Sequence, residues 1–307
     1  YILNQDVRLD GLTYHGIKAD RYLDELGLER IDGEPPSSKF ARLRNAARSE
    51  HEKRLFTVWE RDSHVMELGI RKRVLDSAAT VLNDERNGEL NKSYAKRNGT
   101  GHSATIWEDK KNQDDDHVRA AMSSSFARTF RHIEVDDSVD LDRFDRIQRE
   151  WTTMESQLPK MPAPANFRFR KTGRHNAYGV YSPYYHSITV DPRHPSSMVH
   201  EWMHHYDFTK DNGRQLSMDP DFKGVVDDYQ RTVDKTQIIG TNPDHYLAPT
   251  EIFARAGELW MKWSTDDTDD RSSFLKTSDE YETGFDYEPL IRHKDDIMGF
   301  FNRITSQ

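Results

Sequence analysis

Residues 196–208 read SSMVHEWMHHYDF, and this stretch predicts a buried helix. The serines at its start are typical N-cap residues, and apolar or aromatic side chains occupy most of its faces. His200 and His204 are four positions apart, slightly more than one helical turn, so both imidazoles leave the same face. Two nitrogen ligands at this spacing can bind one tetrahedral metal ion.

Glu201 supplies the group that such a site needs for hydrolysis. It points about one hundred degrees away from His200 around the helix, where it could reach a metal-activated water rather than the metal. As a general base it would take the proton of that water and then pass it to the leaving amine. The alternative is a helix whose polar side only hydrogen-bonds in the core or faces solvent.

A catalytic zinc site usually has a third protein ligand, and downstream carboxylates are the candidates. Glu251 is our first choice, because it begins a predicted helix in the segment PTEIFARA, residues 249–256, whose small residues permit close packing. It could equally be an ordinary acidic residue favoured by the helix dipole. Glu258, Asp207 and His245 are its rivals. The residues that could orient a ligand or contact the substrate are Asp207, His245, Tyr246, Arg255 and Glu258, and Tyr206 is a further candidate donor to an oxyanion.

Composition limits the kind of metal and the partners. The 307 residues include no cysteine, so any metal must be bound by His, Asp or Glu, which suits Zn²⁺ or a harder divalent ion. The net charge of −9 argues against nucleic-acid binding through a basic field.

No apolar run is long enough to cross a membrane, and no signal peptide is visible. We expect a cytoplasmic or virion-associated protein rather than a secreted one. Because the numbering starts at Tyr1, a processed terminus and a removed leader stay open.

The N-terminal part, residues 1–160, is predicted to be helical and highly charged. Apolar residues at spacings of three and four over residues 37–83 indicate an amphipathic stretch broken into two or three helices. Residues 88–116 are polar and rich in Gly and Asn, and we expect a long exposed loop there. A further amphipathic helix is expected over residues 141–158, before a proline cluster.

The part after this cluster, residues 161–307, has a different character and predicts an α+β domain. A short strand is expected at residues 167–169, followed by a β-hairpin. We expect the hairpin strands at residues 177–181 and 187–190. The domain should also contain the metal-site helix at 196–208, the helix of Glu251 at 249–263, an acidic loop at 266–270 and a last amphipathic helix at 294–304.

At His200, Glu201, His204 and Glu251 the chain resembles the gluzincin branch of the zincin metallopeptidases. The resemblance covers about residues 165–263 and implies a zincin-like domain with a small antiparallel sheet beside the active-site helix. Many gluzincins have an acidic residue four positions after the ligand glutamate, where this chain has Arg255, so the partner of the first histidine is not identified. The segment at residues 249–256 is also similar to metallopeptidase-like domains of phage and mobile-element proteins, which implies a viral or mobile-element source.

These observations predict a zinc metalloprotease that hydrolyses a protein or peptide substrate. The alternative is a structural or virion-associated protein that retains a zincin fold and a metal site without protease activity. The presence of Glu201 favours the hydrolase, because a decayed enzyme often loses that residue first. A viral maturation protease that acts on its own assembly partners is a third reading.

Overall fold

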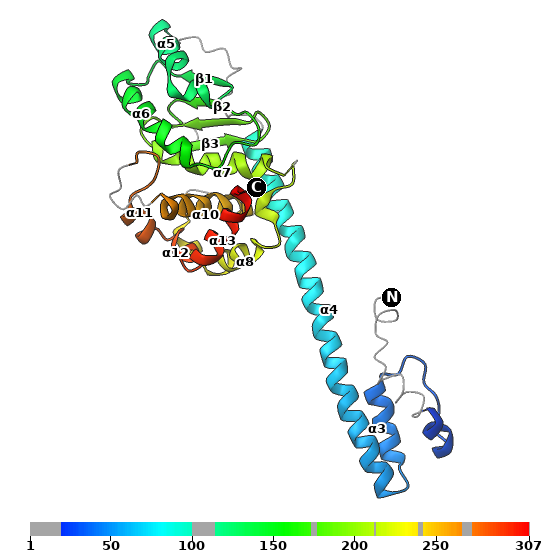
Figure 1. Ribbon diagram of the computed structural model, residues 1–307. Coiled ribbons are helices and arrows are strands. Elements are labelled where there is room, and N and C mark those ends of the chain that lie inside the picture. Colours follow the sequence, from blue (N-terminus) through cyan, green and yellow to red (C-terminus); the bar gives the residue numbers. More distant parts are fainter. Residues whose placement is uncertain are drawn as a thin grey trace. The chain divides into compact units, whose positions relative to one another are not determined.

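The computed structural model describes residues 20–99, 114–172, 177–211, 213–238, 242–265 and 272–306 (Figure 1). The chain divides into two compact units, Tyr1–Asp84 and Glu85–Gln307. The predicted boundary at residue 160 differs from this division. Residues on both sides of position 160 share one hydrophobic core, which is why the C-terminal unit begins far earlier.

The first unit contains a helical segment over residues 20–26 and two longer helices, α3 (Pro36–Ala46) and the first part of α4 (Glu50–Gly99). This confirms the predicted break of the amphipathic stretch. Its small core comprises Leu23, Phe40, Leu43, Phe56 and Trp59. The loop predicted from residue 88 is wrong as far as Gly99, because α4 continues there. Residues 100–113 of that loop and the acidic loop at 266–270 lie outside the described residues.

A four-stranded sheet forms one layer of the second unit, in the order β1-β2-β4-β3. Its strands are β1 (His132–Val135), β2 (Asn166–Phe169), β3 (Gly179–Ser182) and β4 (Ser187–Val190). The hairpin β3–β4 is antiparallel as predicted, but β2 runs parallel to both β1 and β4. The predicted antiparallel sheet is therefore wrong, and the sheet is mixed. Parallel pairing of β1 and β2 follows from the helical crossover between them.

Helices complete the second unit, and the α+β class is confirmed. The predicted helices at 141–158, 196–208, 249–263 and 294–304 all form. Their bounds, with those of the remaining helices, are α5 (Asp115–Ser123), α6 (Leu141–Gln157), α7 (Met198–Thr209), α8 (Lys223–Thr232), α9 (Pro243–Tyr246), α10 (Pro249–Ser264), α11 (Ser278–Thr283), α12 (Glu288–Ile291) and α13 (Lys294–Thr305). No helix among the described residues is long and apolar enough to cross a membrane.

Helix α7 lies between the sheet and α10, with β3 and β4 on one side and α10 on the other (Figure 1). This middle position explains why nearly every side chain of α7 is buried. Gly257 lets α10 approach closely, because a Cβ atom at this position would lie 2.5 Å from Cγ of Met203. The two helices that carry the predicted metal ligands are thereby packed against each other.

Candidate metal centre

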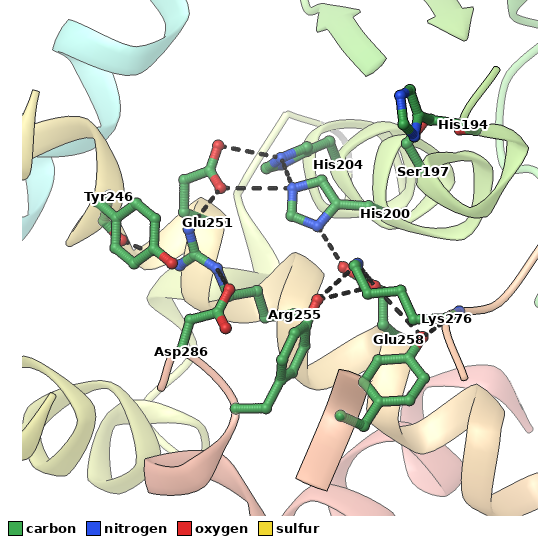
Figure 2. A network of polar contacts seen from close by, with 12 residues as sticks. His194, Ser197, His200, His204, Tyr246, Glu251, Arg255, Glu258, Lys276 and Asp286 are labelled. Carbon is green, nitrogen blue, oxygen red and sulfur yellow. Dashed lines mark hydrogen bonds and ion pairs between the residues drawn. The ribbon is translucent and has the colours of Figure 1, made fainter. Parts of the chain in front are cut away.

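Three of the predicted ligands converge where α7 faces α10. Nε2 of His200 lies 3.1 Å from Nε2 of His204, and these atoms lie 3.4 and 3.5 Å from the Glu251 carboxylate oxygens. Figure 2 shows both imidazoles pointing toward Glu251. One ligand atom from each of the three residues lies within 4.8 Å of the others, so this His–His–Glu triad could hold a metal ion.

Glu258, the rival third ligand, contacts the other side of the His200 ring. Its Oε1 atom lies 2.6 Å from Nδ1 of His200, and Lys276 forms an ion pair with Oε2 (Figure 2). Tyr287 donates a hydrogen bond of 3.0 Å to the same oxygen. Burial alone would raise the pKa of Glu258, but the charge of Lys276 and the bond to His200 lower it to about 2. Glu258 therefore orients His200 as a carboxylate and does not join the triad.

Arg255 binds the outer side of the Glu251 carboxylate. Its Nη2 lies 3.2 Å from Oε2 of Glu251, and its guanidinium carbon lies 3.9 Å from the centre of the Tyr246 ring. The same guanidinium lies 3.7 Å from Asp286. Arg255 is thus a buried cation whose positive charge neutralises the negative charge of the Glu251 carboxylate. Burial of Tyr246 raises the pKa of its hydroxyl, and its ring forms one wall of the Arg255 site.

His245 and Tyr94 form the opposite wall of the triad. Nε2 of His245 lies 3.2 Å from Oε1 of Glu251, and the Tyr94 ring stacks on His245 with centroids 5.2 Å apart. Tyr94 also packs against His204 at 4.9 Å. Tyr94 is not among the predicted site residues, although its helical spacing from Asn87 and Asn91 is a signal that the preceding helix continues through the predicted loop.

Asp207 and Tyr206 lie on α7 and form hydrogen bonds with residues outside the triad. Asp207 accepts a hydrogen bond of 2.7 Å from the backbone N–H of Ser217, and burial raises its pKa to about 7. Asp207 is not one of the three residues in the group that could hold a metal ion. Tyr206 donates its hydroxyl proton to the carbonyl of Ile304, 2.9 Å away, so it anchors α13 and is not aimed at a substrate.

Glu201 is buried beside the edge strand β3. It is 5% exposed, and burial raises its pKa to about 8. A Cβ atom at Gly179 would lie 2.7 Å from both Cγ and Oε1 of Glu201. The glycine thus leaves the space that this carboxylate occupies.

The two histidines of the triad differ in charge. Burial lowers the pKa of His204 to about 4, so this imidazole is neutral at pH 7. Burial acts in the same sense on His200, but hydrogen bonds to Glu251 and Glu258 outweigh it and raise the pKa of His200 to about 10. A metal ion that binds the triad must therefore replace a proton on His200.

No family model, curated protein or solved structure matches this chain. The resemblance to gluzincins accordingly remains a prediction that rests on four residues. The geometry of those residues stands independently of it, because a group of His200, His204 and Glu251 that could hold a metal ion is present in the fold.

Proposed function

We propose that this protein is a zinc-dependent peptidase whose metal is held by His200, His204 and Glu251. The triad geometry carries the proposal. Ligand atoms at the corners of a tetrahedron with zinc bonds of 2.0–2.1 Å are separated by roughly 3.3 Å. The two Nε2 atoms are 3.1 Å apart, and they lie 3.4 and 3.5 Å from the two different oxygens of the Glu251 carboxylate, so the three side chains are close enough to share one ion. Two imidazoles and one carboxylate are also a donor set that suits Zn²⁺ and leaves a fourth position for substrate or water.

Zinc bound there would act as a Lewis acid that polarises the peptide carbonyl and makes water a better nucleophile. The residues of the chain divide the remaining work. His200 donates its Nδ1 proton to Glu258 and so presents Nε2 to the metal. Glu201 takes the proton of the attacking water and returns it to the leaving amine.

The edge strand β3 supports a peptide as the substrate. Within the described parts of the chain, β3 pairs with β4 only and ends the sheet order. An extended peptide can add to such an edge through its main-chain hydrogen bonds. Glu201 lies against Gly179 of this strand, where a Cβ atom would be 2.7 Å from Oε1 of Glu201, so the proposed base lies beside the proposed path of the substrate.

The proposal is tested by measuring metal content and cleavage together. Wild type and His51→Ala, which changes an exposed histidine, should bind one zinc per chain, while His200→Ala should not. Wild type should cleave casein or members of a random peptide library. Glu201→Gln should bind zinc normally but cleave at least about a thousandfold more slowly.

Two outcomes would count against this function. A wild-type chain that binds no zinc would end the peptidase proposal. Zinc binding without any cleavage that depends on Glu201 would support the structural, non-enzymatic role instead.

A further inference from the structure

The middle of α4 carries apolar side chains that are exposed among the residues the structure describes. Residues 71–82 are exposed at every position. Among them Val74 is 45% exposed, Leu75 69%, Val81 57% and Leu82 65%. A helical segment of 12 residues is only marginally stable in water unless its apolar face packs against another surface. This exposure indicates that another surface covers the segment.

The apolar residues lie on one face and are bordered by opposite charges. At 100° per residue, they fall within a stripe about 120° wide that has Arg71 at its N-terminal end and Glu85 at its C-terminal end. Ala78 lies at its centre. This stripe is defined by Arg71, Val74, Leu75, Ala78, Val81, Leu82 and Glu85.

The same face of α4 is covered by an antiparallel helix further toward its N-terminus. Ser37 at the start of α3 donates a backbone hydrogen bond of 2.9 Å to Glu67, and Arg44 near its end forms an ion pair of 2.9 Å with Glu60. Helix α3 of the same chain therefore packs along α4 from Glu67 back toward Glu60. The part of this face that α3 covers stops at Glu67, just before the stripe begins. The face therefore already accepts antiparallel helix packing.

We propose that the stripe pairs with the same stripe of a second copy of this chain, in an antiparallel arrangement centred on Ala78. A two-fold axis through Ala78 brings Val74 opposite Leu82 of the other copy and Leu75 opposite Val81. It also brings Arg71 opposite Glu85 at both ends. The small central side chain permits close approach of the two helices.

Charge decides between this arrangement and a parallel one. Parallel pairing in register would place Arg71 against Arg71 and Glu85 against Glu85, which is unfavourable, whereas the antiparallel pairing makes two attractive contacts. The contact extends over about 22 Å of helix, below the standard size of a stable interface. We therefore expect a concentration-dependent dimer with a dissociation constant in roughly the micromolar range.

The complete absence of cysteine makes the geometry testable by disulfide formation in the full-length chain. Under mild oxidation Ala78→Cys should form disulfide-linked dimers. Val74→Cys and Leu82→Cys should form few dimers alone but a mixed dimer when combined. Val58→Cys, an exposed position on the opposite face of α4, is the control and should stay monomeric. Efficient dimers of Val74→Cys alone would indicate a parallel pair and overturn the antiparallel proposal.

Sedimentation of the same full-length chain tests the charges. Arg71→Glu and Glu85→Arg should each weaken the dimer about tenfold, and the double variant should restore it, because both attractive contacts are re-formed with their signs exchanged. Leu75→Glu should abolish the dimer, whereas Val58→Glu should not. A wild-type chain that is monomeric at 200 µM, roughly two orders above the expected dissociation constant, would refute the proposal. It would mean that something other than a second copy covers the stripe.

Discussion

Nδ1 of His200 lies 2.6 Å from Oε1 of Glu258, a residue two helical turns beyond Glu251 on the same helix. The two carboxylates of α10 therefore act on opposite sides of one imidazole. Glu251 faces Nε2, while Glu258 accepts the proton of Nδ1 and is itself compensated by Lys276. Position 255, four residues after Glu251, carries an arginine and cannot provide an acidic partner for His200. Glu258, three residues further on, provides it.

This relationship predicts different costs for the two carboxylates. Glu251→Ala removes a ligand and should abolish zinc binding at micromolar metal. Glu258→Gln keeps the shape of the side chain but loses the charge that fixes the His200 tautomer, so zinc affinity should fall about 10–100-fold. Competition with a chelating dye measures both values. If Glu258→Gln proved the more damaging change, Glu251 would not be the third ligand.

The Gly179→Ala variant should separate catalysis from metal binding. A Cβ atom there would lie 2.7 Å from Cγ of Glu201 and 2.8 Å from Oγ of Ser197, so the Glu201 carboxylate must move. Displacement of a general base by about 1 Å costs roughly a hundredfold in rate. We expect that loss in kcat with zinc content unchanged. Gly224→Ala, which meets open space, is the control and should have normal activity.

Removal of the buried cation beside Glu251 should have opposite effects on stability and on metal binding. Arg255→Met leaves the buried carboxylate of Glu251 without its guanidinium partner, which should destabilise the metal-free protein by about 3–5 kcal/mol. Zinc can replace the missing positive charge, so its affinity for the folded variant should rise. Thermal unfolding with and without zinc measures both effects. A smaller zinc-induced stabilisation in the variant than in wild type would contradict this role of Arg255.

The triad could be predicted because the two histidines and the glutamate each lie in a helix with a recognisable local sequence pattern. Four-residue spacing on a helix brings His200 and His204 together, and a proline-started helix with small residues brings Glu251 close. The role of Glu258 was left open because it depends on the packing angle between α7 and α10. Strand β1 was missed, and the direction of β2 was wrong, because pairing across long sequence separations leaves no local pattern. Tyr94 was missed because its polar neighbours in α4 resemble a loop.

Asp207 makes stability depend on pH. Its pKa is about 7 in the folded protein, against 3.8 for the ordinary group. Between these values the folded state binds more protons than the unfolded state, so the free energy of unfolding falls as the pH rises. Asp207→Asn keeps an acceptor for the N–H of Ser217 and should remove this loss. Between pH 4 and pH 7 the free energy of unfolding of this variant should rise relative to that of wild type by up to about 4 kcal/mol. Denaturant unfolding in a chelating buffer measures the difference, with the exposed Asp244→Asn as control. Equal pH dependence of Asp207→Asn and wild type would show that Asp207 is ionised at no cost within the fold.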